Sequence, residues 1–159
     1  MGKIYDLGID VGSTTVKTVI LDDGEFIYNK YERHFSKVRE TVAEQLRAIR
    51  ELYPEDKFRI GSAGLGIAEA SGISFVQEVF SAFIAVNKKY PKADVVVELG
   101  GEDAKIIFLT GGVEQRMNGS CAGGTGAFID QMAGLLGVTP DEMNDLALKA
   151  EKTYPIASR

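Results

Sequence analysis

The N-terminal part of the chain alternates short apolar segments with turn residues. Apolar side chains dominate residues 4–10, 15–21 and 25–31, and only a few turn-forming residues separate one segment from the next. Connections this short exclude a parallel crossover, which needs a dozen or more residues. The pattern therefore predicts an antiparallel meander of three strands.

Helical periodicity follows the meander and begins at Ser36. The apolar positions share the spacing of one face of an amphipathic helix and are Val38, Val42, Leu46, Ile49 and Leu52. Residues 58–63 are predicted to form a fourth strand, which leads into the loop 64–66. A second helix is predicted over residues 74–90, and Pro91 marks its end. The predicted order of elements is βββαβα.

A second copy of this order then begins. Residues 95–98, 105–109 and 113–117 are predicted strands, and residues 124–136 are a predicted helix that Gly137 ends. The repetition indicates a duplicated fold.

A capping box opens the last predicted helix. Thr139 is the expected N-cap, Pro140 the first helical residue and Glu142 the acid that completes the box. The fourth strand of the second copy has not appeared by this point. We therefore expect a duplicated α/β fold with domains 1–93 and 94–159, in which the second copy is truncated and the chain is a fragment of a longer one.

Composition narrows the class of protein. The chain has 159 residues, 45% of them hydrophobic, and a net charge of −5, which gives no basic footprint for nucleic acid. No apolar run reaches the roughly 18 residues of a membrane span, and the N-terminus lacks a signal-peptide pattern. We expect a cytoplasmic protein that binds neither nucleic acid nor membrane. The single cysteine, Cys121, excludes an internal disulfide and leaves a packing residue, a reactive thiol or a ligand shared with another chain.

A carboxylate, a glycine turn and a lysine occur twice, 88 residues apart. The first copy runs from Asp10 to Lys17 and the second from Glu98 to Lys105. Glycine lets the backbone approach a phosphate closely, and successive backbone N–H groups donate to it. The repeat therefore predicts a site for a nucleotide phosphate tail and its metal ion. The candidate cofactor-binding residues in it are Gly12, Ser13, Thr14, Thr15, Lys17, Gly100, Gly101, Glu102, Asp103 and Lys105.

The two carboxylates are the candidate catalytic residues. Asp10 would hold Mg²⁺ through water, because Mg²⁺ keeps most of its waters in proteins. Glu98 would orient a metal-bound or attacking water. The first motif alone is a common turn, and Glu98 alone is most often a solvated acid at a strand end. It is the repetition that favours phosphate binding. Lys105 could instead cap an exposed hairpin, and Glu102 and Asp103 could be ordinary loop acids.

A loop of small residues leads into the helix predicted at 124–136. Free N–H groups and the helix dipole favour an anion at such a start, either a phosphate or a thiolate-ligated cluster. Cys121 is the candidate metal ligand there, and Gly124 and Thr125 are further cofactor-binding candidates. The alternative for Cys121 is a small buried residue in a glycine-rich loop. His34 is the only histidine, and surface or packing use is favoured over catalysis.

These motifs carry a resemblance to known proteins. Residues 8–15 and 98–105 resemble the acetate kinase, sugar kinase, heat-shock and actin superfamily. Residues 118–126 resemble, within it, the ATPase activators of 2-hydroxyacyl-CoA dehydratases and benzoyl-CoA reductases. The resemblance implies a ribonuclease H-like, actin-like ATPase fold that binds ATP or ADP with Mg²⁺. The second motif departs from the usual pattern, because Glu98 stands where an Asp is usual.

The resemblance also implies an electron-transfer function. Such activators are homodimers that hold one [4Fe–4S] cluster between two cysteines from each subunit, and Cys121 matches the first of these. ATP would then gate electron delivery from a ferredoxin or flavodoxin to a dehydratase or CoA-ester reductase. Two alternatives stay open: a small-molecule kinase of the amino-sugar type, and a nucleotide-dependent switch module without redox chemistry.

Overall fold

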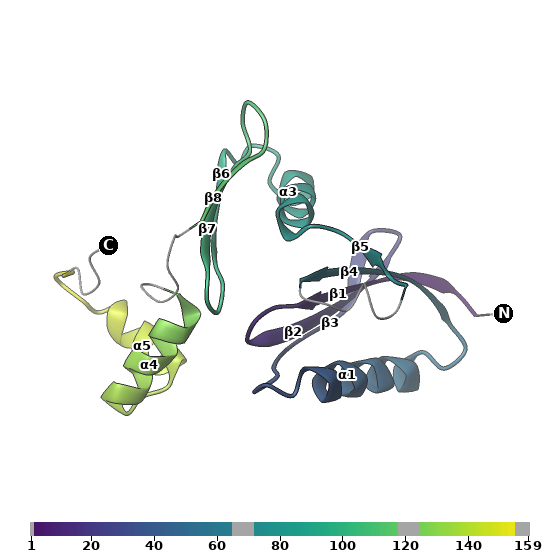
Figure 1. Ribbon diagram of the computed structural model, residues 1–159, viewed down its shortest axis with the longest axis horizontal. Coiled ribbons are helices and arrows are strands. Elements are labelled where there is room, and N and C mark those ends of the chain that lie inside the picture. The colour runs from purple at the N-terminus through teal and green to yellow at the C-terminus, as the bar shows by residue number, and fades with distance from the viewer. Residues whose placement is uncertain (1, 65–71, 118–124, 155–159) are drawn as a thin grey trace. The chain divides into compact units, whose positions relative to one another are not determined.

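The computed structural model describes residues 2–64, 72–117 and 125–154. The chain divides into two compact units, Met1–Pro91 and Lys92–Arg159, each described here by itself (Figure 1). The fold is of the ribonuclease H-like, actin-like class.

The first unit is built on a mixed sheet. The meander is confirmed as β1 (Ile4–Val11), β2 (Thr15–Asp22) and β3 (Glu25–Arg33), paired antiparallel. The predicted fourth strand is β4 (Lys57–Gly64), which pairs parallel with β1, and a short β5 (Ser74–Phe75) pairs parallel with β4. The resulting strand order is β3-β2-β1-β4-β5.

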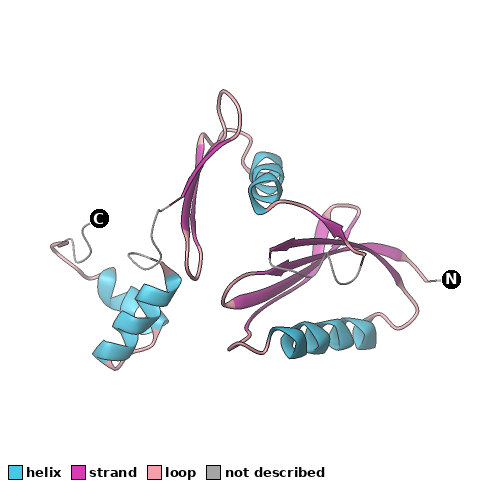
Figure 2. Ribbon diagram, in the orientation of Figure 1, coloured by secondary structure: helices cyan, strands magenta, loops and turns pink. Residues whose placement is uncertain are grey.

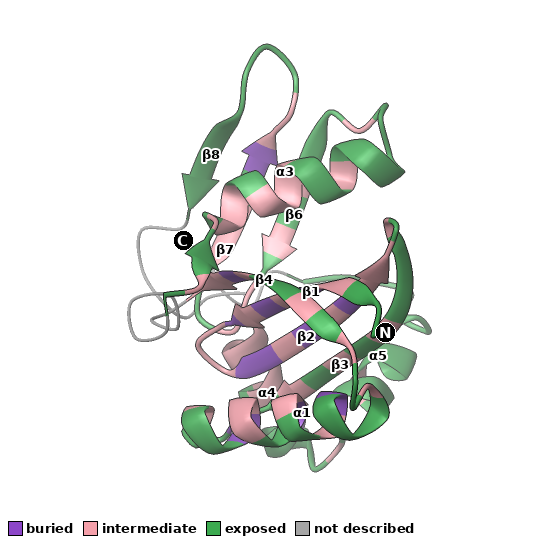
Figure 3. Cartoon of the chain, turned by 90° about the vertical axis from the view of Figure 1, so that its right-hand side faces the viewer, coloured by how far each residue is buried: buried purple, intermediate pink, exposed green. Residues whose placement is uncertain are grey.

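Helix α1 (Val38–Leu52) lies against one face of this sheet and closes its core (Figure 2). The fully buried apolar side chains come from β1, β2 and α1, and they are Leu7, Ile9, Val11, Val16, Ile20 and Ile49 (Figure 3). The predicted stripe is confirmed over most of its length, since Val38, Val42 and Leu46 pack against this core. Leu52 does not, and 61% of it is exposed. Each fully buried aliphatic side chain contributes about 1.5–3 kcal/mol, so the contact between α1 and the sheet holds the unit together.

One fully buried polar residue, Gln45, joins α1 to the meander. Its Oε1 accepts from Thr18 Oγ1 at 3.0 Å, and its Nε2 donates to Val16 O at 3.4 Å and to Glu32 Oε2 at 3.2 Å. Lys30 Nζ lies 3.0 Å from the same Glu32 oxygen. Hydrogen bonds from Lys30 and from Gln45 hold the pKa of Glu32 below its usual value. Because the buried amide has partners for both of its polar atoms, its burial carries no unpaired group.

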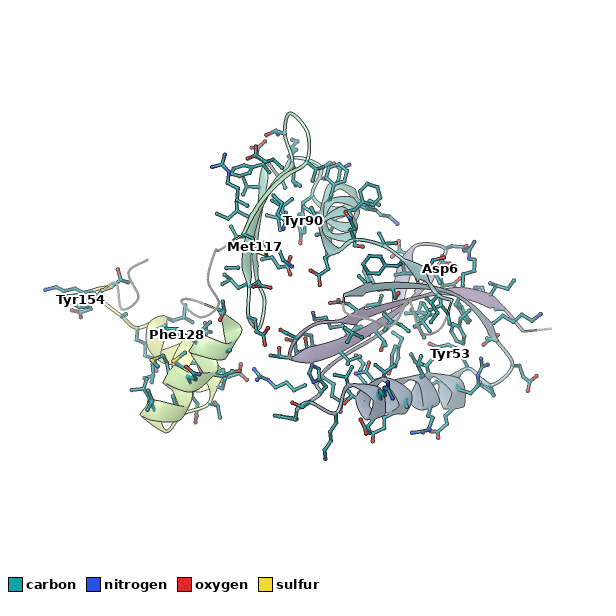
Figure 4. All side chains as sticks on the ribbon, viewed as in Figure 1. Asp6, Tyr53, Tyr90, Met117, Phe128 and Tyr154 are labelled. Carbon is teal, nitrogen blue, oxygen red and sulfur yellow. The ribbon has the colours of Figure 1, made fainter. Side chains whose placement is uncertain are left out.

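Aromatic side chains pack together at the C-terminal end of α1. Tyr53 (labelled in Figure 4) lies just after the helix, with its ring centroid 5.4 Å from that of Tyr5 and 6.1 Å from that of Phe58. Both pairs have the edge-to-face arrangement that aromatic rings prefer.

The second predicted helix is shorter than expected. Residues 74–90 were predicted as one helix, but Ser74 and Phe75 form β5 and α3 covers Glu78–Lys89. The prediction was wrong at residues 74–77, because Ser74 and Phe75 pair with Gly61 and Ser62 of β4, a partner that lies outside the local sequence, and the helix begins only at Glu78. Along α3, Val79, Phe83 and Val86 are partly buried.

The second unit repeats the meander and adds two helices. Its strands are β6 (Val95–Leu99), β7 (Ala104–Phe108) and β8 (Glu114–Met117), paired antiparallel in that order. Helix α4 (Gly126–Leu136) and helix α5 (Pro140–Ala147) follow. All three strands were predicted from the sequence within one residue at each end.

The helix ends of this unit follow the predicted local chemistry. Gly137 ends α4 with a φ of +68°, a left-handed conformation that glycine adopts without penalty. The capping box is confirmed: Thr139 Oγ1 accepts from Glu142 N–H, and Glu142 Oε2 accepts from Thr139 N–H at 2.7 Å. The Glu142 carboxylate accepts from the Thr139 backbone N–H and also from Thr139 Oγ1 at 2.9 Å, and these two hydrogen bonds lower the pKa of Glu142. None of the helices in the described ranges is both long enough and apolar enough to cross a membrane.

Candidate functional site

The first glycine turn connects two charged residues that face one another. Asp10 on β1 and Lys17 on β2 are directly opposite in the strand register, and Lys17 Nζ lies 2.7 Å from Asp10 Oδ2. Between them, Gly12 N–H donates to Thr15 O at 2.9 Å and closes the turn. Both charged side chains are about one-third exposed, so the pair contributes little to stability. Its effect is to hold a carboxylate and an ammonium at the mouth of the turn.

The second turn has the same construction. Glu98 on β6 and Lys105 on β7 are directly opposite, with Lys105 Nζ 3.6 Å from Glu98 Oε1. Gly100 N–H donates to Asp103 O at 2.8 Å, as Gly12 does to Thr15. A Cβ at Gly100 would lie only 3.0 Å from that carbonyl oxygen. The repeat in the sequence is therefore also a repeat of register, hydrogen bonding and charge.

The side chains around the turns differ in access. Ser13 and Thr14 are partly exposed, whereas Thr15 is buried, with 4% of its surface exposed. Glu102 and Asp103 are exposed in the second turn. The hydroxyls that a ligand could reach in the first turn are therefore those of Ser13 and Thr14.

Two buried side-chain oxygens in the described part of the chain have no hydrogen-bond partner, and both belong to predicted site residues. They are Asp10 Oδ1 and Thr125 Oγ1. Buried polar atoms without a partner are few in native proteins, and an ordered water or an ion commonly supplies the missing contact. The Asp10 oxygen fits a water bound to Mg²⁺, since Mg²⁺ binds proteins through one or two carboxylates and keeps several waters. Within the described ranges, no group of three or more His, Cys, Asp or Glu side chains lies close enough to hold a metal ion.

Gly64, to which the sequence analysis assigned no role, lies against the Asp10 carboxylate. It ends β4 opposite Val11, with a φ of +82°. A Cβ at this position would overlap the Val11 carbonyl oxygen and lie 2.9 Å from Asp10 Oδ1. Only glycine lets β4 end this close to the carboxylate. A glycine at the end of a strand beside an acid-bearing strand is the signal that could have identified it.

The start of α4 is bonded to the second turn. Gly126 N–H donates to Gly100 O and Ala127 N–H donates to Gly101 O, both at 2.9 Å. The expectation of free amides at this helix start is therefore wrong for these two groups, because carbonyl oxygens of the second turn satisfy them. The predicted residues Cys121 and Gly124 lie outside the described residues.

A known protein family matches almost the whole chain. The model of the BadF/BadG/BcrA/BcrD ATPase family matches residues 7–159, a range that contains both turns and α4. The chain belongs to this family. The repeated turns are thus those of a BadF/BadG/BcrA/BcrD ATPase.

Several curated relatives of this family member are dehydratase activators. The chain is 33% identical over 163 residues to the (R)-2-hydroxyglutaryl-CoA dehydratase activating ATPase of Acidaminococcus fermentans, covering 98% of this chain and 63% of the relative. It is 35% identical over 162 residues to the activator of lactoyl-CoA dehydratase of Anaerotignum propionicum, covering 98% of this chain and 62% of the relative. The chain thus spans about three fifths of the length of these relatives.

Solved structures of related proteins also match the chain. Component A of the A. fermentans (R)-2-hydroxyglutaryl-CoA dehydratase matches with a TM-score of 0.83 and 31% identity, covering 98% of this chain and 62% of that one. The activator of the 2-hydroxyisocaproyl-CoA dehydratase from Clostridium difficile, solved with bound ADPNP, matches with a TM-score of 0.82 and 28% identity, covering 97% and 60%. The ethanolamine utilization protein EutJ from Carboxydothermus hydrogenoformans, at 16% identity and a TM-score of 0.59, covers 89% and 60% and supports the fold alone.

Proposed function

We propose that this family member is an ATP-binding and ATP-hydrolysing activator whose phosphate contacts are made by the two glycine turns. The observation that carries the proposal is the buried, unpartnered Oδ1 of Asp10 beside a glycine turn that recurs in the second unit. Support also comes from a relative that is named an activating ATPase and from the ADPNP bound to a related activator.

Each residue of the first turn has a distinct role in this proposal. Asp10 would hold Mg²⁺ through a water that donates to its Oδ1, and Lys17 would place its ammonium on a phosphate oxygen. Gly12, Ser13 and Thr14 present backbone N–H groups, and the two accessible hydroxyls donate to the same phosphates. Bound Mg²⁺ supplies neutralisation of the phosphate charge during hydrolysis.

The second turn supplies the residue that acts on water. Glu98 orients the attacking water or a metal-bound one, held in place by Lys105 directly opposite. Gly100 and Gly101 repeat the close backbone approach, with Glu102 and Asp103 at the rim.

The hydrogen bonds between α4 and the second turn connect the proposed phosphate contacts to the start of that helix. Gly100 and Gly101 carry both the proposed phosphate contacts and the carbonyls that bind the first N–H groups of α4. A change in the turn on hydrolysis is thereby passed to α4 and to Cys121, five residues before it. Hydrolysis would act as a gate for a conformational change rather than as phosphoryl transfer to a substrate.

The electron-transfer part of the proposal rests on the family resemblance. Cys121 is proposed to ligate a [4Fe–4S] cluster shared by two copies of the protein, and such clusters take four thiolates. This sequence contains one cysteine, so two copies supply two thiolates and the other two would come from a second cysteine outside it. The proposed partners are a 2-hydroxyacyl-CoA dehydratase or CoA-ester reductase as acceptor and a ferredoxin or flavodoxin as donor, in the cytoplasm.

A calorimetric titration of the full-length protein with ADPNP tests nucleotide binding. Binding that requires Mg²⁺ is the expected result, and no binding with Mg²⁺ present would contradict the proposal. Anaerobic reconstitution with iron and sulfide tests the cluster, with the iron content compared between the wild-type protein and Cys121→Ala. We expect about four irons per dimer, lost in the variant; no iron in the wild type would contradict the cluster.

A further inference from the structure

The single histidine of the chain touches the first glycine turn. His34 follows β3 and is buried, with 7% of its surface exposed. Its ring Nε2 lies 3.2 Å from Gly12 O, and its backbone N–H donates to Thr14 O at 3.1 Å. Two carbonyl oxygens of the turn are thus bonded to one residue, which the sequence analysis expected to have only a surface or packing use.

The contacts of the ring identify its tautomer. Ser36 N–H donates to His34 Nδ1 at 3.1 Å. A backbone N–H can only donate, so Nδ1 carries no proton; a carbonyl oxygen can only accept, so Nε2 carries one. The neutral ring protonated at Nε2 is therefore the one form that satisfies both contacts, and it donates to Gly12 O.

The two residues after His34 have a strained backbone conformation, which holds the Ser36 N–H against the ring. Phe35 and Ser36 have φ values of +44° and +66°, which side-chain-bearing residues rarely adopt. Lys37 N–H donates to His34 O at 2.6 Å and closes the turn that brings Ser36 N–H back to the ring. Strained residues persist where the surrounding structure holds them, and they concentrate at ligand-binding sites.

The consequence of the ring contact lies in the geometry of the peptide unit. In a planar trans peptide the C=O and the following N–H point in opposite directions. A Gly12 carbonyl directed at His34 therefore turns the Ser13 N–H away from the ring, and a Thr14 carbonyl directed at the same residue does likewise for the Thr15 N–H. Glycine offers little resistance to a peptide flip, and a flipped Gly12 carbonyl would present an oxygen where a phosphate needs a donor.

We propose that His34 is a positioning residue that locks the first glycine turn in its phosphate-binding orientation by donating from Nε2 to Gly12 O. This inference rests on the proposed nucleotide binding and names a residue outside the two repeated turns. The second turn has no histidine in this sequence to do the same. The first turn is thus prepared for phosphate before the nucleotide arrives.

Three substitutions in the full-length protein separate positioning from general stability. His34→Phe keeps a ring of similar size without a donor, and His34→Gln keeps an amide N–H at about the place of Nε2. Thr41→Ala is the control, because the buried Thr41 Oγ1 donates to Lys37 O at the start of α1 and not to a residue of the turn. Mg·ADPNP affinity is measured by calorimetry and the melting temperature by circular dichroism.

We expect His34→Phe to weaken Mg·ADPNP binding about tenfold, which corresponds to about 1.4 kcal/mol. His34→Gln should bind within about threefold of the wild type, and Thr41→Ala should melt lower with unchanged affinity. Unchanged affinity in His34→Phe, with binding intact in the wild type, would overturn the positioning role alone. No binding in the wild type would overturn the proposed function and the positioning role with it.

A spectroscopic readout remains informative even if His34→Phe fails to fold. His34 is the only histidine of this sequence, and comparison with the spectrum of His34→Gln identifies its ring nitrogen signals in the full-length protein. Long-range ¹H–¹⁵N spectra of the wild type should show the proton on Nε2, and the Nε2 signal should shift when Mg·ADPNP is added. A proton on Nδ1, or an Nε2 signal that does not respond to bound nucleotide, would overturn the inference.

Discussion

The amide of Gly126 donates to the carbonyl of Gly100 at 2.9 Å and joins the first turn of α4 to the second glycine turn. The contact is close: a Cβ at Gly126 would lie 3.2 Å from that oxygen. It links the residues proposed to bind phosphate to the helix that follows Cys121.

Gly126→Ala should weaken this connection. The added methyl group presses on Gly100 O, so the gain of about 0.5–1 kcal/mol that Ala normally brings to a helix should be absent or reversed. The free energy of unfolding in urea measures the effect. Gly134→Ala is the matched control, because Gly134 lies in the same helix with open space around a Cβ. If Gly126→Ala stabilised the protein as much as Gly134→Ala, the close contact would not exist in solution.

Gly64→Ala should be among the most damaging single substitutions in the first unit. Its positive φ and the overlap of a Cβ with the Val11 carbonyl oxygen should lower the free energy of unfolding by about 2 kcal/mol or more. Gly61→Ala serves as control, since Gly61 lies in the same strand with nothing within 4 Å of a Cβ. Equal losses for the two variants in urea unfolding would show that Gly64 is not specifically required.

Gln45→Leu should destabilise the first unit although it adds an apolar side chain to the core. The change leaves the Thr18 hydroxyl and the Val16 carbonyl without their partner, at a cost of about 1–3 kcal/mol. Glu44→Gln, on the exposed side of α1, should change the stability by less than about 0.5 kcal/mol. A Gln45→Leu variant as stable as the wild type would mean that the buried network contributes nothing.

The stability of the chain should fall as the pH drops below the normal range of glutamate. The pKa of Glu32 is held below 4.5 by hydrogen bonds from Lys30 and Gln45, and that of Glu142 by bonds from Thr139. A lowered folded-state pKa stabilises the fold above the unfolded-state value, and that stabilisation is lost as pH falls through the folded-state value. Urea unfolding between pH 7 and pH 3 should show the loss, and Glu32→Gln should make the decline shallower. An identical pH profile for Glu32→Gln would contradict this assignment.

The strands of the fold were predictable because their signals are local. Each meander strand is a short apolar run between turn residues, and each predicted strand agrees with the observed one within two residues at either end. The capping box at Thr139 is likewise contained in four consecutive residues. The short strand β5 was missed because Ser74 and Phe75 become a strand only through pairing with β4.

In the candidate site, too, contacts within one hairpin could be predicted from the sequence, and contacts between separate elements could not. Asp10 and Lys17 could be paired from the sequence, because a tight turn between two strands fixes their register. The contacts of His34 with Gly12 and of Gly126 with Gly100 depend on how separate elements pack, and no local pattern encodes them. Gly64 was assigned no role for the same reason, since its closeness to Asp10 follows from the parallel pairing of β1 and β4.

Asp10 provides the most direct test of the account, through Mg²⁺-dependent binding of ADPNP to the full-length protein. Asp10→Asn keeps the size of the side chain and removes its charge, and it should weaken Mg·ADPNP binding by about tenfold or more. Asp6→Asn is the matched control: Asp6 lies on the same strand and is also ion-paired, with Arg59, away from the turn. The account predicts a loss in Asp10→Asn alone. Mg²⁺-dependent binding of equal strength in Asp10→Asn and the wild type would contradict it.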